Sequence, residues 1–290
     1  MTRFAGRDFE DPIIIASGVV PDVPAYMKRV CKRYRPSAIT TKSLTLSPLQ
    51  PHPPPTFIKL DQGCYLNAIG LGNPGPSFLS GLEVDCPLIV SVAGRESQEI
   101  VQLVKEAGSK GVLLELNLSS PNRAGYGQSI ASMTYEVVKD AVSVSRVPIL
   151  VKLGPWDNVV ELAGKAISAG ASGLTLINTM RGMAVDIESG RPILSYVTGG
   201  VSGRCIHSVA VRVIYEVYRE YGVEIVGTGG VYTWRDVIEM MMVGAKMVGL
   251  GTVLVERGLE AINEIREGLK NYLASKGLKE EEIVGYAVKR

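Results

Sequence analysis

The sequence is poor in the residues that build metal centres. Four cysteines are widely spaced and form no C-x-x-C pair: Cys31, Cys64, Cys86 and Cys205. The only two histidines are His52 and His207, and nothing in the sequence pairs them. We therefore predict reduced and mostly buried thiols, no metal site, and no zinc or iron–sulfur cluster bound by this chain alone.

Long hydrophobic runs and an excess of one charge are also missing. No apolar stretch approaches the roughly 18 residues of a membrane-spanning helix. The N-terminal stretch MTRFAGRDFEDP has no apolar signal-peptide core. Lys plus Arg number 31 and Asp plus Glu number 29, a balance that argues against nucleic acid or an anionic membrane as partner. We expect a cytoplasmic protein with no membrane span, and a local positive site for a small anion is compatible with this balance.

Short apolar runs alternate regularly with amphipathic stretches along the chain. The runs are continuous and rich in Ile, Val and Leu, which is typical of strands buried on both faces of a parallel sheet. The predicted strands cover residues 13–17, 38–42, 88–93, 112–118, 149–153, 174–179, 224–228 and 247–251.

Amphipathic helices are predicted between these strands. Helical periodicity covers residues 96–107, 207–221, 258–274 and a stretch that ends before Gly170. Asp157 is placed to cap the helix that ends before Gly170, and Thr233 with Asp236 resembles a capping box. Eight strands, each followed by a helix except where an insertion intervenes, indicate an α/β protein with a closed (β/α)8 TIM barrel.

An open, doubly wound sheet would also contain parallel strands, but the even repeat to eight units favours closure. No linker or low-complexity tract divides the chain, so residues 1–290 are predicted to be one domain. The Pro-rich segment 47–56 is expected to be an ordered loop on the barrel rim.

Polar residues gather where the predicted strands end, which is where barrel enzymes place their active groups. Glycine-rich segments at residues 199–203, 229–230 and 251–252 predict close approach of the backbone to a phosphate. The alternative is glycine that serves tight turns alone. Lys42 and Lys152 end apolar strands, so we expect them to pair with a bound anion, whereas solvated lysines at strand ends are the alternative.

Four asparagines also fall at the predicted rim: Asn67, Asn117, Asn122 and Asn178. Each amide offers donors and an acceptor, so the set suits a planar ligand with alternating C=O and N–H edges. A single asparagine at such a place is usually a cap or turn residue.

Several ordered motifs in these rim segments resemble those of dihydroorotate dehydrogenases. They are T-K-S (41–43), L-N-A-I-G-L-G-N-P-G (66–75), N-L-S-S-P-N (117–122), I-N-T-M-R-G-M-A-V-D-I (177–187) and T-G-G-V-S-G (198–203). The resemblance runs from about residue 10 to residue 255 and is closest to the soluble class whose catalytic subunit works with an electron-transfer partner.

The resemblance implies bound FMN and oxidation of dihydroorotate to orotate in pyrimidine (UMP) biosynthesis. It implies FMN contacts from Ser17, Lys42, Ser43, Asn117, Lys152, Ile177, Gly203, Gly229, Gly230, Gly251 and Thr252. It implies substrate contacts from Lys42, Asn67, Ala68, Ile69, Gly70, Leu71, Asn117, Asn122, Asn178 and Thr179. The catalytic base falls on Ser120, which would remove the C5 proton while a hydride passes from C6 to N5 of FMN.

Two positions depart from the partner-dependent class. The soluble classes usually carry Cys at the position of Ser120, and serine there is typical of the membrane-associated class. Ser91 stands where the partner-dependent class usually has an Asn near the flavin. A serine base needs a proton relay, for which ordered water is one candidate and Thr179 a side-chain candidate. The stretch 121–129 is expected to be a lid over the substrate, with a plain surface loop as the alternative.

The resemblance further implies a separate subunit that carries FAD and an iron–sulfur cluster and passes electrons to NAD⁺, in a homodimer or heterotetramer. Fumarate or a quinone is an alternative acceptor. The rival functions are a flavin barrel acting on another dihydropyrimidine, a flavin-free enzyme acting on a phosphorylated metabolite, and a non-catalytic subunit that docks a redox partner.

Overall fold

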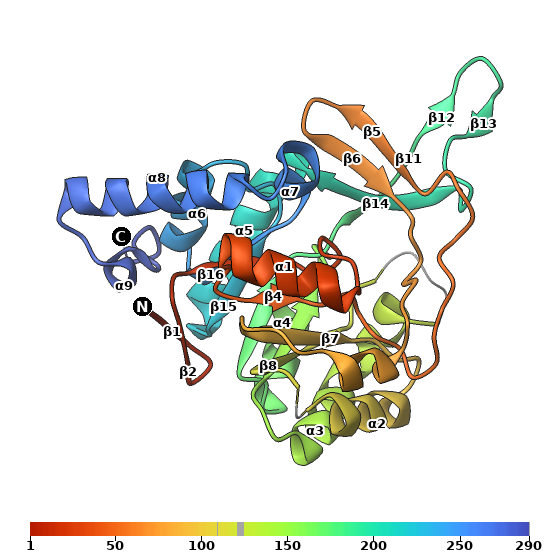
Figure 1. Cartoon of the computed structure of the whole chain (residues 1–290), viewed down its shortest axis with the longest axis horizontal. Helices are drawn as coiled ribbons and strands as arrows, with labels where there is room; N and C mark the ends of the chain where they lie inside the picture. Colours follow the sequence, from red (N-terminus) through yellow and green to blue (C-terminus); the bar gives the residue numbers. More distant parts are fainter. Residues whose placement is uncertain (109, 121–124, 290) are drawn as a thin grey trace.

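The computed structural model describes residues 1–108, 110–120 and 125–289 and confirms the predicted TIM barrel (Figure 1). Eight parallel strands pair around a closed ring in chain order: β3 (Ile13–Ile15), β4 (Ile39–Thr40), β7 (Leu88–Val92), β8 (Leu113–Asn117), β9 (Ile149–Leu153), β10 (Gly173–Leu176), β15 (Ile225–Thr228) and β16 (Ala245–Leu250). Because the last strand, β16, pairs with the first, β3, the open doubly wound alternative is wrong.

Each observed barrel strand overlaps its predicted range, and the differences lie at the strand ends. Ser17, Lys42 and Thr179 were placed inside strands but follow the observed ends of β3, β4 and β10. These residues belong to the segments that leave the ring and form its rim. Along each strand, side chains point alternately into the barrel and outward to the helices. Because both faces are buried, the apolar runs in the sequence are continuous.

Helices surround the ring. They are α1 (Pro24–Tyr34), α2 (Ser97–Ala107), α3 (Thr134–Val144), α4 (Val159–Ser168), α5 (His207–Tyr221), α6 (Trp234–Met242), α7 (Thr252–Arg257), α8 (Ala261–Lys276) and α9 (Glu280–Ile283). The periodicity predicted α2, α4, α5, α6 and α8 among them, with α8 three residues later at its start than predicted. The described residues also form the 3₁₀ helices η1 (Pro76–Gly81), η2 (Gly127–Met133) and η3 (Arg204–Ile206). Among the described residues, no helix has both the length and the hydrophobicity to cross a membrane.

Two predicted helix caps have different outcomes. The capping box is confirmed, because the backbone N–H of Thr233 donates to Asp236 Oδ2 at 2.7 Å at the start of α6. The cap at Asp157 is wrong, because Asn158 is the N-cap of α4 and makes no side-chain hydrogen bond there. A turn in which Val159 N donates to Trp156 O, at 3.1 Å, delays the start of the helix.

Insertions after the second and sixth barrel strands build a sheet at the rim. Strands β5 (Phe57–Asp61) and β6 (Cys64–Asn67) pair with β14 (Thr198–Gly203) and β11 (Met180–Met183) in the order β11-β14-β6-β5. A small hairpin of β12 (Val185–Asp186) and β13 (Arg191–Pro192) projects beyond this sheet (Figure 1). The Pro-rich segment is a rim loop, as predicted, and hydrogen-bonds through Leu49 to Asn73.

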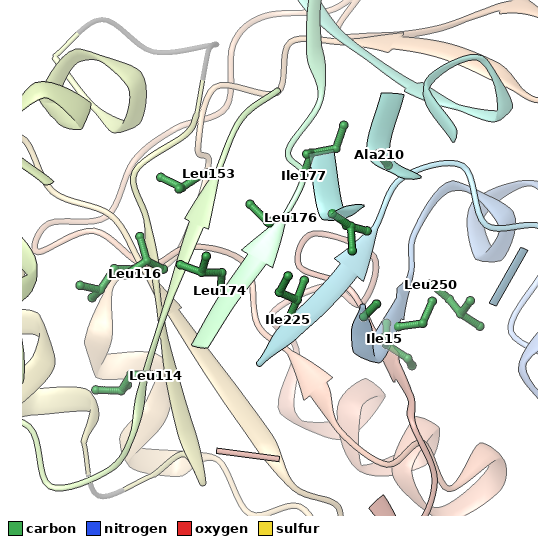
Figure 2. Close-up of a cluster of buried hydrophobic side chains, with 14 of the residues drawn as sticks. Ile15, Leu114, Leu116, Leu153, Leu174, Leu176, Ile177, Ala210, Ile225 and Leu250 are labelled. Carbon is green, nitrogen blue, oxygen red and sulfur yellow. The ribbon is translucent and has the colours of Figure 1, made fainter. Parts of the chain in front are cut away.

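The core has an outer and an inner part. Outward-facing side chains of the strands pack against the helices in one large cluster, part of which Figure 2 shows. The inner part fills the amino-terminal end of the barrel, where the hairpin of β1 (Thr2–Phe4) and β2 (Arg7–Phe9) adds Phe4 and Phe9. Each such side chain contributes about 1.5–3 kcal/mol by leaving water. The apolar plug leaves only the opposite end of the barrel for polar groups.

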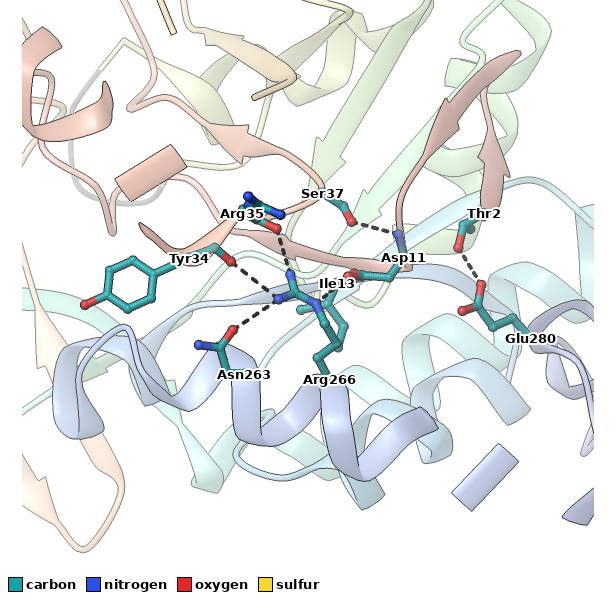
Figure 3. Close-up of polar contacts among 9 residues, drawn as sticks. All are labelled: Thr2, Asp11, Ile13, Tyr34, Arg35, Ser37, Asn263, Arg266 and Glu280. Carbon is teal, nitrogen blue, oxygen red and sulfur yellow. Dashed lines mark hydrogen bonds and ion pairs between the residues drawn. The ribbon is translucent and has the colours of Figure 1, made fainter. Parts of the chain in front are cut away.

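An ion pair joins the last long helix to the start of the barrel (Figure 3). Arg266 of α8 contacts Asp11 through Nε, and its Nη2 donates to the carbonyl of Arg35 at 2.9 Å. Asp11 Oδ1 in turn accepts from the backbone N–H of Ile13 at 2.8 Å. Because both charged side chains are mostly buried, loss of one partner would leave a costly unpaired charge.

The cysteines do not all behave as the sequence suggested. Cys31 of α1 and Cys86, just before β7, form a disulfide, so the prediction of four reduced thiols is wrong. Cys64 and Cys205 are free, but Cys205 is exposed rather than buried. The pairing joins residues 55 positions apart, and sequence spacing gives no signal for a contact that depends on how α1 packs beside β7.

Candidate active site

The carboxyl ends of the barrel strands surround a cavity of about 260 Å³. Its walls come from segments that follow six of the eight barrel strands and from Lys152 within β9, while the rim sheet adds residues from β5, β6 and β14. This is the face on which TIM barrels carry active sites. The rim segments therefore meet at one place, as the sequence predicted.

All residues predicted to contact FMN line this cavity. They are Ser17, Lys42, Ser43, Asn117, Lys152, Ile177, Gly203, Gly229, Gly230, Gly251 and Thr252. Most of the predicted substrate set also lines it: Lys42, Asn67, Ile69, Gly70, Leu71, Asn117, Asn178 and Thr179. Ala68 does not, because its side chain packs against Leu66 and Leu194 beneath the rim sheet. Asn122 lies outside the described residues.

Ser120 also lines the cavity, and its side chain is buried. It follows β8 by three positions, so strand β8 fixes where the chain enters the rim. The predicted lid over the substrate begins at the next residue, and its first part, residues 121–124, lies outside the described residues.

Glycine backbone forms one wall of the cavity, next to the seventh and eighth barrel strands. Gly229 and Gly230 have φ values of +128° and +68°, which side chains rarely adopt. A Cβ on Gly230 would lie 2.7 Å from the carbonyl oxygen of Gly203. At Gly251, by contrast, a Cβ would meet nothing within 4 Å, so that glycine borders open space. TIM barrels commonly hold a phosphate between these two loops.

Two lysines line the cavity, and a carboxyl group lies near one of them. Lys152 is 8% exposed, and its ammonium has no hydrogen-bond or ion-pair partner among the described residues. Lys42 lies near Asp22, both of whose carboxyl oxygens are buried without a hydrogen bond in the described part of the chain. Burial raises the pKa of Asp22, and the positive charge of Lys42 offsets this only in part.

A directed chain of hydrogen bonds runs from the rim into the barrel. Asn178 Nδ2 donates to Ser119 Oγ at 3.0 Å, and Ser119 Oγ donates to Asn117 Oδ1 at 3.0 Å. Asn117 Nδ2 then donates to Ser43 Oγ at 2.8 Å. The chain continues at 2.9 Å between Ser43 and Ser91 hydroxyls and ends at 3.0 Å on Glu115 Oε1.

This chain fixes the orientation of two predicted site residues. An ionised carboxylate accepts hydrogen bonds and cannot donate them. With Glu115 as such an acceptor, each hydroxyl earlier in the chain has one favoured direction of donation. The amide of Asn117 is thereby held with its oxygen toward Ser119 and its NH₂ toward Ser43. The sequence indicated Asn117 and Asn178 but gave no sign that Glu115, inside an apolar strand, closes the chain.

Other lining residues were missed by the sequence reasoning. They are Ala16, Gly18, Val19, Phe57, Ser202, Ile206, Thr228, Val231, Gly249 and Val255. Ser202 falls within the T-G-G-V-S-G motif (198–203) but was not itself named as a site residue. Phe57 and Val255 carried no signal, because they come from the β5–β6 hairpin and from α7.

His207 is less isolated than its place in the sequence suggested. Its Nδ1 lies 3.0 Å from the carbonyl oxygen of Gly229, and its Nε2 lies 3.1 Å from Glu239 Oε2 and 3.9 Å from Asp236 Oδ1. These three side chains bring possible metal-ligand atoms within 4.8 Å of one another. They lie behind the Gly229 loop, outside the cavity lining.

Comparison with known proteins gives a family. The dihydroorotate dehydrogenase family model matches residues 1–273. A protein of Sulfolobus acidocaldarius named dihydroorotate dehydrogenase B (NAD(+)), catalytic subunit, is 58% identical over 100% of both chains. A protein of Saccharolobus solfataricus with the same name is 57% identical over 97% of each chain. A solved structure, DHODH from Eimeria tenella with ferulenol, covers 100% of this chain and 88% of its own at a TM-score of 0.84 and 21% identity, which shows a shared fold.

Proposed function

Because the chain belongs to the dihydroorotate dehydrogenase family, we propose that its rim cavity binds FMN and oxidises dihydroorotate to orotate in pyrimidine biosynthesis. One observation carries this proposal. The glycine loops, the Ser120 hydroxyl and the ammonium of Lys152, which has no partner in the described part of the chain, all line the same cavity. A scaffold without chemistry has no need of this combination.

The residues present suit FMN. Gly229, Gly230 and Gly251 line the cavity without side chains that would cover their backbone N–H groups, and with the open space at Gly251 they would hold a phosphate. Lys152 offers a buried cation for the part of the ring system that becomes negative on reduction. A buried charge is costly without compensating partners, so Lys152 suits a ligand that is anionic.

FMN, when bound, supplies the acceptor for the hydride that leaves C6 of dihydroorotate. The protein holds the pyrimidine with amide groups. Asn117 and Asn178 line the cavity, and each uses one amide N–H to donate to a serine hydroxyl, so the second N–H of each would be available to the carbonyl edge next to C5. Such oriented donors stabilise the enolate-like charge that develops as the C5 proton departs. Lys42 supplies a positive charge on the substrate side of the cavity.

Ser120 is the base that removes the C5 proton in this proposal. Its hydroxyl is a much weaker acid than the thiol that soluble relatives of the family usually carry, with a reference pKa of about 8.5. The proton must therefore move on, and Thr179, which lines the same cavity, is the side chain that we assign to this relay.

The test is anaerobic stopped-flow reduction of bound FMN by dihydroorotate. We expect Ser120→Ala to retain the yellow cofactor and to slow reduction by about 10²–10⁴-fold, the usual contribution of a general base. Ser143→Ala is the control, because Ser143 is exposed on α3 and only donates to Asp140 O. Reduction at the wild-type rate in Ser120→Ala would exclude Ser120 as the base. Faster bleaching by dihydrouracil would assign the site to another dihydropyrimidine.

We also propose that electrons leave through a second subunit with FAD and an iron–sulfur cluster, and pass to NAD⁺. The names of the relatives describe a catalytic subunit and NAD(+). In the described chain the two free thiols, Cys64 and Cys205, are too few for the four ligands of such a cluster. Purification from the host with visible spectroscopy tests this. A complex without FAD and iron–sulfur absorption, or reduction of fumarate or quinone by the chain alone, would contradict it.

A further inference from the structure

A layer of polar side chains lies inside the barrel, between the apolar plug and the rim cavity. Its central members are Glu115, Lys152 and Thr175, which are 3%, 8% and 2% exposed. They point inward because they occupy alternate positions of β8, β9 and β10, and Thr175 is directly opposite Lys152 in the strand register. Three polar groups at this depth require partners.

A second, small cavity lies among these three side chains. Its volume is about 10 Å³, which is room for a single water molecule. Thr175 Oγ1 faces it and has no hydrogen-bond partner among the described residues. One water there would hydrogen-bond to Glu115, Lys152 and Thr175. These are three partners, and buried waters usually make about three hydrogen bonds.

Glu115 thus stands between two networks. One of its oxygens ends the chain of donors that begins at Asn178 and passes through Ser91. Its carboxyl group also lines the small cavity that Lys152 lines from the other side. Lys152 lines both this cavity and the large one, so it is the side chain that the two cavities share between Glu115 and the rim.

We propose that Glu115 is a positioning residue that sets the reduction potential of the bound flavin. It binds one buried water together with Lys152 and Thr175, and its negative charge partly offsets the positive charge that Lys152 presents to the cavity. This rests on the proposed function, because it requires FMN above Lys152. A carboxylate at that depth disfavours the anionic reduced flavin, since charges interact strongly in a dry interior.

The decisive variant is Glu115→Gln in the FMN-loaded protein. Gln has nearly the same shape and keeps an oxygen to accept from Ser91, but it has no charge. We expect its midpoint potential to rise enough to change the ratio of reduced to oxidised FMN at least tenfold at a fixed potential, which is about 30 mV for a two-electron couple. Ser91→Ala is the matched control, because it interrupts the hydrogen-bond chain and leaves every charge in place.

The results separate the possible failures. An equal potential in wild type and Glu115→Gln overturns the inference, and so does an equal shift in Ser91→Ala, which would indicate a structural effect. A wild-type protein that binds no flavin refutes the proposed function instead. If Glu115→Gln does not fold, a high-resolution crystal structure of the wild type decides. A water within about 3.2 Å of Glu115, Lys152 and Thr175 supports the inference. A cavity without a water, or one filled by apolar side chains, overturns it.

Discussion

Replacement of Gly251 by alanine should weaken FMN binding and leave folding intact. Gly251 is the residue that precedes α7, and it lines the rim cavity. A Cβ built on it meets no atom of the described protein within 4 Å. The added methyl group therefore projects into the space that we assign to the phosphate of FMN, where it has no protein neighbour to disturb.

The magnitude follows from the contacts that the methyl group would displace. A backbone N–H that donates to an anion contributes about 1.5–3 kcal/mol. Loss of one such bond raises the dissociation constant of FMN by about 10- to 150-fold, at 1.4 kcal/mol for each factor of ten. The thermal unfolding temperature of the FMN-free protein should stay within a degree or two of wild type.

Fluorescence titration of FMN-free protein with FMN measures the affinity. Gly81→Ala is the matched control, because a Cβ there also meets nothing within 4 Å but Gly81 lies outside the cavity. Gly230→Ala would not serve, since φ is +68° and its Cβ would lie 2.7 Å from Gly203 O and from His207 Cβ. An unchanged affinity in Gly251→Ala would refute the placement of the phosphate.

Two further predictions concern stability. The double variant Cys31→Ala/Cys86→Ala should lose about 4 kcal/mol of unfolding free energy in urea denaturation, because the disulfide closes a loop of 55 residues; a loss below about 1 kcal/mol would mean that the bond does not form. Burial raises the pKa of Asp22 in the folded protein above its pKa in the unfolded chain. At a pH between these two pKa values the unfolded chain binds fewer protons than the folded protein, so the free energy of unfolding falls as the pH rises from the lower to the higher value. Asp22→Asn should therefore stabilise the FMN-free protein at pH 7 and lose this advantage toward pH 4. An advantage that is the same at both pH values would contradict the assignment.

Local patterns in the sequence were sufficient for the barrel and for much of its rim. A buried parallel strand needs a continuous apolar run, and a helix needs apolar residues at a period of 3.6, so both leave a mark within ten or fifteen residues. Chain order then gives the order of strands in a closed ring. Rim residues such as Lys152 and Gly251 stood out because a lysine or a glycine loop at a strand end is unusual at that place.

Tertiary structure alone decided which distant groups meet. The Cys31–Cys86 bond, the burial of Asp22 near Lys42, and the end of the hydrogen-bond chain on Glu115 all join residues from different strands or helices. Such contacts depend on distances across the barrel, which no local period encodes. A glutamate in an apolar strand looks the same in sequence whether it faces a helix or the barrel interior, and only closure of the ring brings it beside Lys152 and Thr175.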